Sequence, residues 1–439
     1  MDPQALARLY ADHVATIEGR YTKALAASGF DAVVVHSGTA AKKTTYDDQF
    51  WPVRPTPAFQ HWAPLYDADC FVVVEPGKKT ILVWPEQTSI WERPAAPEAT
   101  TFLGVLDVRR EARPALPAGK RVAFIGENRA LARELGFDDA SIDPPELARA
   151  LDALRVAKTP YEIACLAEAN KRAALGHDAV RRAFAGGGRS ELELHLAFLQ
   201  ATRQDDPETP YKNIVALGKN GAVLHHIAYG RDASKAGSIL LDAGATFMGY
   251  CSDITRTWTK PDGAASQTFA GVVTAFEAMQ QRLVAKVAIG MPYEALHDES
   301  HRQVSAILKE AGLATGTVEE IDAKGISRAF YPHGLGHSLG LQTHDVGCAL
   351  LKPRADNPFL RNTSTIAEDQ VFTIEPGLYF IEGLLSDLRK KPEGKLVDWN
   401  VVEALAPFGG IRIEDDVVVT KTGVRNLTRE VLSVGGGAA

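Results

Sequence analysis

Five side chains in the C-terminal half are of types that bind divalent metal ions, and each lies in a short segment predicted as a strand or a glycine-rich loop. They are Asp242, Asp253, His337, Glu375 and Glu414. Four carboxylates and one imidazole can hold two ions at once, and this mixture of oxygen and nitrogen suits manganese, cobalt or zinc. A water shared by two such ions becomes a nucleophile near neutral pH. The pattern therefore indicates a hydrolase.

The two aspartates lie in the segment SILLDAGATFMGYCSDITRTW (238–258), which is predicted as two strands joined by a turn. If the turn is centred between Phe247 and Met248, Asp242 lies directly opposite Asp253. Cross-strand partners point to one face of a hairpin, so both carboxylates would reach one cavity. Like charges there would repel unless cations lay between them. The alternative is that either aspartate belongs to a turn or a solvated face.

The histidine lies in PHGLGHSLGLQTHD (332–345). His333 and His337 have the i, i+4 spacing of a helical zinc site, but the general-base glutamate of that motif is absent and three glycines oppose a helix. We therefore expect a loop whose backbone comes close to another segment. The alternative for any one of its histidines is a satisfied core or surface residue.

The two glutamates lie in segments predicted as strands. Glu375 is in TIEPGLYF (373–380) and Glu414 is in GIRIEDDVVV (410–419), where the neighbours are apolar or β-branched. An unpaired charge is expensive to bury in such a strand, so a partner is required. A metal ion is one solution, and a salt bridge from Arg412 to either glutamate is the other.

Together these segments resemble the pita-bread metallopeptidases, the family of methionyl aminopeptidase, aminopeptidase P, creatinase and prolidase, from about residue 160 to the end. The resemblance implies that all five residues are ligands and that Asp253 and Glu414 bridge the ions. Four motifs are similar to the bacterial proline dipeptidases, including those also known as organophosphorus acid anhydrolases. They are HGLGHSLGLQTHD (333–345), LKPRADNPFLRNTS (351–364), IEPGLYFIEGLL (374–385) and FGGIRIED (408–415).

The resemblance also implies roles around the ligands. Glu375 would shuttle a proton, while His344 and His225 would contact substrate and stabilise the tetrahedral intermediate. Arg361 would hold the free carboxylate after proline, a contact suited to its planar fork. The other expected substrate-site residues are His333, Tyr211, Arg412, which would orient the carboxylates, and Asp48, which would meet the α-amino group. His226 has no such counterpart and is interpreted as structural.

The implied fold is α+β, with a pita-bread catalytic domain at 158–439 and a smaller α/β domain with a mixed sheet at 1–157. Local signals support this order. Thr159, Pro160 and Glu162 form a helix-start signal for a helix that continues to Phe184. Further elements are expected as helices over 5–27, 145–157, 267–287 and 293–311, a strand in 31–38, a hairpin about Pro76-Gly77 in 70–84, a strand at 122–125, and a capping box from Ser190 to Glu193.

The expected activity is hydrolysis of Xaa-Pro dipeptides, releasing proline, by a hydroxide between two divalent ions per subunit, with manganese expected before zinc or cobalt. Aminopeptidase P is the alternative, and phosphotriester hydrolysis is a plausible side activity. A binding module that has lost its ligands is a different class, but all five ligands are present here.

Composition defines the setting. The net charge of −7 argues against nucleic acid as a partner, and four scattered cysteines argue for a reducing compartment. The N-terminus has no secretory pattern, and no stretch approaches the ~20 apolar residues of a membrane span. We therefore expect a cytoplasmic protein. The acidic pair among aromatic residues at 46–51 resembles a segment that approaches the neighbouring subunit in the anhydrolase-like prolidases. The resemblance therefore implies a homodimer in which this loop reaches the partner's site, and the alternative is a solvated loop on a monomer.

Overall fold

The computed structural model describes residues 1–86, 91, 96–98 and 100–432. Two compact units are present. The first contains Met1–Cys165 with Met248–Tyr250, and the second contains Leu166–Phe247 with Cys251–Ala439. The unit changes within helix α6 (Pro160–Ala185), a few residues beyond the boundary predicted at 157.

The first unit is built on a five-stranded sheet in the order β4-β3-β2-β1-β5. Strand β1 pairs antiparallel with β2 and parallel with β5, which confirms the predicted mixed sheet. The strands are β1 (Ala32–His36), β2 (Phe71–Val74), β3 (Ile81–Val83), β4 (Asp107–Arg109) and β5 (Val122–Ile125). The helices are α1 (Pro3–Ser28), α2 (Pro57–Gln60), α3 (Phe102–Val105), α4 (Arg129–Glu134) and α5 (Pro145–Leu154).

Local signals placed several of these elements correctly. The β2–β3 hairpin pairs Phe71 with Val83, so it is centred on the predicted Pro76-Gly77 turn, and Gly77 has a φ of 80°. Helix α6 begins with the predicted capping box, in which the Thr159 amide donates to Glu162 Oε2 at 2.8 Å. The residues at 46–51 lie in a segment, 44–67, that contains no helix or strand apart from α2.

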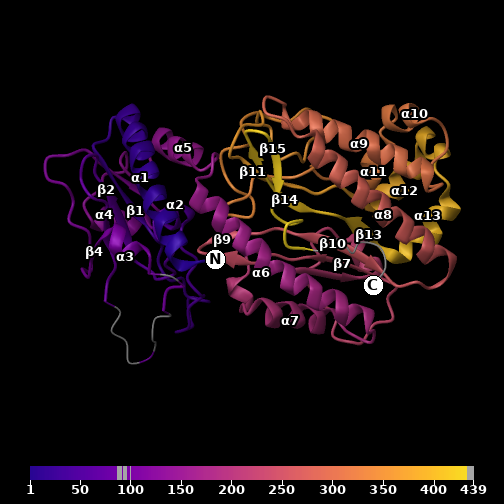
Figure 1. The fold of residues 1–439 in the computed structure, drawn as a ribbon, viewed down its shortest axis with the longest axis horizontal. Helices are drawn as coiled ribbons and strands as arrows, with labels where there is room; N and C mark the ends of the chain where they lie inside the picture. The colour runs from indigo at the N-terminus through magenta and orange to yellow at the C-terminus, as the bar shows by residue number, and fades with distance from the viewer. Residues whose placement is uncertain (87–90, 92–95, 99, 433–439) are drawn as a thin grey trace. The chain divides into compact units, whose positions relative to one another are not determined.

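The second unit places its strands between two groups of helices, with α6 and α7 (magenta in Figure 1) on one side and α8 and α9 (orange) on the other. Apolar residues of α6 and α7 pack against β6, β7 and β10, and those of α8 and α9 pack against β11, β13 and β14. These helices are α7 (Glu191–Thr202), α8 (Gly263–Lys286), α9 (Tyr293–Glu310), α10 (Val318–Ala323), α11 (Ile326–Phe330), α12 (Glu382–Lys390) and α13 (Trp399–Leu405). None of the helices within the described ranges is long and apolar enough to cross a membrane.

The strands of the second unit form short sheets, including the three-stranded sheets β10-β7-β6 and β11-β14-β15. Their bounds are β6 (Ile214–Leu217), β7 (Ser238–Asp242), β8 (Thr246–Phe247), β9 (Tyr250–Cys251), β10 (Thr255–Thr259), β11 (Val371–Ile374), β12 (Gly377–Tyr379), β13 (Gly410–Arg412), β14 (Asp415–Thr420) and β15 (Gly423–Asn426). Both predicted strand glutamates lie at junctions, one between β11 and β12 and the other between β13 and β14.

The predicted register of the aspartate hairpin is wrong by one residue at the turn. Strand β7 pairs Asp242 with Thr255 and not with Asp253. The turn is Met248-Gly249, and both residues have positive φ (52° and 85°), the combination that a two-residue hairpin turn requires. This shift moves the partner of Asp242 by two positions. Because side chains alternate along a strand, the two aspartates stay on one face.

Candidate metal centre

The five predicted ligands converge in the second unit. His337 Nε2 lies 3.4 Å from Asp253 Oδ2 and 3.6 Å from Glu375 Oε1. The ligand atoms of Asp253, His337 and Glu414 all lie within 4.8 Å of one another. Asp242 joins them through Tyr211, whose hydroxyl lies 2.6 Å from Asp242 Oδ1 and 2.5 Å from Asp253 Oδ1. Separate segments of chain therefore deliver four carboxylates and one imidazole to one place.

The pKa values of the carboxyl groups in this cluster indicate whether it suits metal ions. Burial, followed by repulsion from neighbouring carboxylates, raises the pKa of Asp253 and of Glu414 well above the usual range. Burial also raises the pKa of Glu375 to about 7, although His337 and Arg412 oppose that rise. Such crowding is relieved either by protons or by cations. An oxygen-rich set with one imidazole is what paired divalent transition ions prefer, so the residues fit two ions.

Arg412 is hydrogen-bonded to Asp242 directly and to Glu414 through Thr255, and so orients both carboxylates. It is 4% exposed, and its Nη2 donates to Asp242 Oδ2 at 2.5 Å while its Nη1 donates to the Tyr379 hydroxyl at 2.9 Å. Its Nε donates to Thr255 Oγ1, which in turn donates to Glu414 Oε2 at 2.5 Å. The alternative of a direct Arg412–glutamate salt bridge is not found among the described residues, because the guanidinium pairs with Asp242 instead.

Two further histidines lie close to His337 and Glu375. The ring of His344 lies 4.4 Å from that of His337, edge to face. His333 Nε2 lies 2.8 Å from the Tyr379 hydroxyl, and its Nδ1 lies 3.8 Å from Glu375 Oε2. Burial and then Arg412 lower the pKa of His333 to about 3, and the charge of His225 adds to this effect. These residues therefore bring neutral imidazole donors to the edge of the cluster.

His225 itself is exposed, so it is available to a substrate. The neighbouring His226 Nε2 lies 2.8 Å from Glu191 Oε2, which also accepts from the Gly230 amide. This contact agrees with the structural role predicted for His226.

The segment that carries His337 is a loop, as its glycines predicted, and two of them make close approaches. A Cβ on Gly336 would lie 2.2 Å from the carbonyl oxygen of Thr373, and the His337 amide donates to Thr373 Oγ1 at 3.1 Å. A Cβ on Gly334 would lie 2.9 Å from Leu360 Cα. The loop at 332–345, called the ligand loop below, therefore packs closely against β11 at Gly336 and against the 351–364 segment at Gly334.

Arg361 follows immediately after that second contact. Its side chain is exposed, and among the residues that the structure describes it has no hydrogen-bond or ion-pair partner. Loss of solvent contact, then the charges of His337 and Arg361, lower the pKa of His344, which places the guanidinium within electrostatic reach of the ligand loop. An unpaired cation in this position is available to an anionic ligand.

The segment before Arg361 is clamped to α9. The Asn357 side chain, 2% exposed, donates to Glu294 Oε1 at 2.9 Å and to Asp298 Oδ1 at 3.1 Å. Arg354 Nη2 donates to Asp298 Oδ1 at 2.6 Å. These contacts hold the segment at its middle and leave the guanidinium of Arg361 free.

Asp48 lies in the first unit, in the exposed loop between β1 and α2. Its aromatic neighbours Tyr46, Phe50 and Trp51 are 101%, 45% and 57% exposed. Large apolar side chains are thus presented to solvent around the acidic residue, a pattern associated with an interaction surface.

Comparison with known proteins identifies the family. A sequence model of metallopeptidase family M24 matches residues 164–421, and a model of the Xaa-Pro dipeptidase N-terminal domain matches residues 8–153. The chain belongs to metallopeptidase family M24. A protein named Xaa-Pro dipeptidase from Pseudoalteromonas atlantica is 37% identical, with 98% of this chain and 99% of the relative covered. Another from Aeromonas hydrophila is 38% identical, with 96% and 98% covered.

Solved structures show the same fold. The aminopeptidase PepP of Pseudomonas aeruginosa superimposes with a TM-score of 0.70 over 98% of this chain and 96% of that one, at 22% identity. The M24 assignment and this likeness confirm the predicted pita-bread domain with a preceding N-terminal domain.

The M24 centre also has supporting residues that sequence reasoning missed. Asp416 Oδ2 accepts from the Asp253 amide at 3.0 Å and from Asn170 Nδ2 at 2.8 Å. Asp415 pairs with Arg256 and Arg429, each at 2.7 Å. The available signal was the acidic pair that directly follows the ligand Glu414 in an otherwise apolar strand. Such a pair is costly to bury without partners.

The two close glycine contacts give a matched prediction. Gly336→Ala is expected to displace His337 from β11, so the purified variant should contain less metal and show a lower kcat. Gly334→Ala should instead displace the Arg361 segment, raising KM for a dipeptide while metal content is unchanged. Overpacking of this kind typically costs about 1–3 kcal/mol. Metal analysis and steady-state kinetics of the pair check both, and identical behaviour of the two variants would contradict the assignment.

Proposed function

We propose that this M24 protein is an Xaa-Pro dipeptidase that hydrolyses the bond before a C-terminal proline and releases free proline. The observation that carries the proposal is the exposed, unpaired guanidinium of Arg361 on a segment packed against the ligand loop. The similar bacterial proteins that bear the name Xaa-Pro dipeptidase match along nearly their whole lengths, which supports the same activity here.

The reaction needs the two ions that the five ligands fit. We propose that Asp242, Asp253, His337, Glu375 and Glu414 hold them, that Asp253 and Glu414 are shared between them, and that manganese is the physiological metal. When bound, the ions polarise the scissile carbonyl and lower the pKa of a water so that it can attack. Metal analysis of protein purified without added metal tests the manganese assignment.

Side chains of the protein then transfer the proton and stabilise the negative charge that develops during the reaction. Glu375 accepts the proton of the attacking water and passes it to the leaving proline nitrogen. His344 and His225 donate to the oxygen on which negative charge develops in the tetrahedral intermediate. His333 and Tyr211 line the substrate site, while Arg412 keeps the carboxylates oriented through the contacts described above.

The proposed contact between Arg361 and the substrate carboxylate limits the length of the peptide that is cleaved. Arg361 binds the proline carboxylate through two parallel N–H···O contacts, a geometry specific to a planar fork. The contact lies one residue beyond the scissile bond, so a longer peptide has no carboxylate there. Aminopeptidase P is the alternative, since proteins of that activity share the fold, but at 22% identity the likeness concerns the fold alone.

Comparison of Ala-Pro with Ala-Pro-Ala separates the two activities. A carboxylate contact is worth roughly 1.5–3 kcal/mol, so kcat/KM for Ala-Pro should exceed that for Ala-Pro-Ala by roughly 10- to 150-fold. Faster cleavage of the tripeptide would establish aminopeptidase P instead. A phosphotriester included in the same panel tests the proposed side activity.

The proposed assembly is a homodimer in which the loop at 46–51 approaches the partner's site and Asp48 meets the substrate's α-amino group. Mixing and refolding an Asp48→Ala subunit with an Asp253→Asn subunit should restore part of the activity, because one site of the mixed dimer keeps both its metals and an intact Asp48. Sedimentation verifies that mixed dimers form. Mixed dimers without rescue beyond the separate variants would refute the shared site.

We also propose a cytoplasmic location. Cys70, Cys165, Cys251 and Cys348 are buried and form no disulfide within the described residues, which suits a compartment that keeps thiols reduced. Fractionation of cells that express the protein at its natural level tests the location.

A further inference from the structure

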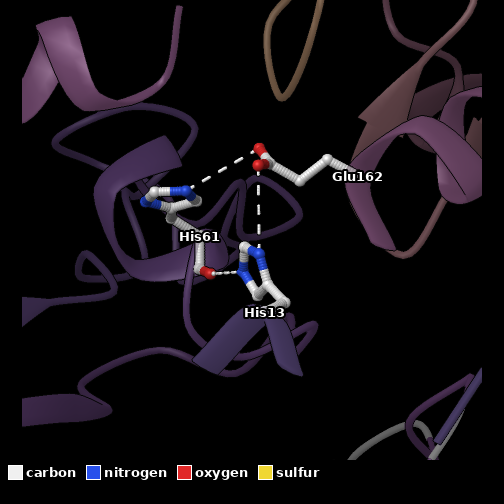
Figure 2. Close-up of side chains that lie close together, drawn as sticks. All are labelled: His13, His61 and Glu162. Carbon is white, nitrogen blue, oxygen red and sulfur yellow. Dashed lines mark hydrogen bonds and ion pairs between the residues drawn. The ribbon is translucent and has the colours of Figure 1, made fainter. Parts of the chain in front are cut away.

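A second group of buried titratable side chains lies in the first unit, and the proposed peptidase reaction does not use it. His13 comes from α1, His61 ends α2, and Glu162 is in the first turn of α6. Each is 1% exposed. Figure 2 shows the two imidazoles and the carboxylate turned toward one another. Three segments of chain therefore bring two imidazoles and one carboxyl group into the same buried space.

The hydrogen bonds of this group leave nitrogen lone pairs directed inward. His13 Nε2 lies 2.8 Å from the carbonyl oxygen of His61, so this nitrogen carries the proton and donates. His13 Nδ1 is then the lone-pair nitrogen, and it lies 2.8 Å from Thr159 Oγ1. Neither ring nitrogen of His61 has a hydrogen-bond partner among the described residues. A fully buried imidazole with both nitrogens unsatisfied requires an explanation.

The spacing of the three groups discriminates between explanations. His61 Nε2 lies 3.7 Å from Glu162 Oε1, and His13 Nδ1 lies 3.9 Å from Glu162 Oε2. Both distances exceed those of hydrogen bonds. A bridging water that contacts both atoms at about 2.8 Å would hold them roughly 4.5 Å apart. Two ligands about 2.0–2.1 Å from one zinc ion lie roughly 3.3–3.4 Å apart at the tetrahedral angle, and roughly 3.8 Å apart when the angle widens to about 130°. The two observed distances are therefore closer to those of a wide-angle zinc site than to that of a water bridge.

The catalytic ligands provide an internal standard for this comparison. His337 Nε2 lies 3.4 and 3.6 Å from its two carboxylate neighbours at the M24 centre. The distances in the first unit are only slightly longer than those between the proposed ligands of the M24 centre, and the three ligand atoms all lie within 4.8 Å of one another.

We propose that His13, His61 and Glu162 bind a transition-metal ion of the zinc type as a structural cross-link between α1, α2 and the start of α6. Thr159 turns its hydroxyl away from His13 Nδ1 when the ion is bound. This site is separate from the catalytic centre and uses the opposite ligand balance, with two imidazoles to one carboxylate.

Nearby charges define which ions the site accepts. Burial and then the surrounding charges, which include Arg155, Arg20 and Lys158, lower the pKa of His61 well below its usual value, and burial lowers that of His13. Both imidazoles are therefore neutral and able to ligate. The positive charges of Arg155, Arg20 and Lys158 also weaken the binding of any ion that is held by electrostatic attraction alone. Zinc or cobalt, which bond well to imidazole, is therefore favoured over manganese, magnesium or calcium.

The test separates this site from the catalytic centre in the full-length protein. The double variant Asp253→Asn, His337→Ala disables the catalytic ligands, and after zinc loading and gel filtration it should retain about one zinc per chain. Adding either His61→Asn or Glu162→Gln in that background should abolish the retained zinc. The control His36→Asn, which changes another fully buried histidine of the same unit, should retain it. Circular dichroism verifies folding of each variant.

Two outcomes overturn the proposal. One is a folded catalytic-centre variant that retains no zinc, and the other is retained zinc that is unchanged by both cluster variants. Crystals of the unmodified protein grown with zinc require no substitution at all. Anomalous scattering at the zinc edge should show a peak between His13, His61 and Glu162, and a zinc-filled catalytic centre without that peak would refute the site.

Discussion

Asp253→Asn is expected to abolish hydrolysis of Ala-Pro and to leave the purified protein depleted of metal. The carboxylate is 5% exposed and lies 3.4 Å from His337, in the middle of the ligand set. Loss of residues that merely support metal ligands typically lowers affinity or activity by 10–100-fold, so loss of a ligand should exceed about 100-fold. Steady-state kinetics and mass-spectrometric metal analysis measure the two effects.

The fold of that variant should survive. Without metal, replacing one of two adjacent carboxylates removes repulsion, so the metal-free variant should be at least as stable toward urea as the metal-free wild-type protein. Asp232→Asn, which changes an exposed aspartate of the same unit, serves as the control and should alter neither metal content nor activity. Full activity of Asp253→Asn, or of the wild-type protein after exhaustive chelation, would exclude the dinuclear mechanism.

Arg361→Lys is expected to lower kcat/KM for Ala-Pro by roughly 10- to 150-fold, because a lysine cannot make two parallel contacts to one carboxylate. Amidating the dipeptide removes the same interaction from the substrate side. The amide should therefore be a much poorer substrate than Ala-Pro for the wild-type enzyme, and only slightly poorer for the variant.

Arg354→Lys is the matched control, since it changes an arginine of the same segment that already pairs with Asp298. It should leave the discrimination between acid and amide intact. If the wild-type enzyme and Arg361→Lys are equally sensitive to amidation, Arg361 does not bind the substrate carboxylate.

Local chemistry explains why much of this fold was predictable. The start of α6 depends on Thr159 and Glu162, which are neighbours in sequence and contact each other in the structure. The convergence of the five predicted ligands was predictable because their residue types and order resemble those of a known family.

The hairpin register was not predictable from alternation alone. It depends on whether the positive-φ pair falls at Met248-Gly249 or one residue earlier, and glycine accepts that backbone more readily than phenylalanine does. That preference was the signal that the predicted turn overlooked.

Clusters of side chains that are far apart in the sequence could not be predicted, for a different reason. His13, His61 and Glu162 are separated by long stretches of chain, and nothing in the residues around each one indicates the other two. Asp416 likewise reaches Asn170 and the Asp253 amide only after α6 and β14 have packed in the second unit. Partners of this kind follow from the packing of elements, whose positions no local pattern specifies.

The contact between Gly334 and Leu360 has a consequence for how substrate preference can change in evolution or by engineering. One end of the 351–364 segment is fixed against the loop that carries His337, and its middle is tied to α9. Insertions near Leu360 would disturb the chemistry together with the choice of substrate. At the start of the segment the Leu351 amide donates to Thr363 Oγ1 at 2.9 Å, but the side chains of Leu350 and Leu351 are 66% and 72% exposed and can change without altering that contact. Variation in the substrates accepted should therefore arise there first, with the catalytic apparatus left unchanged.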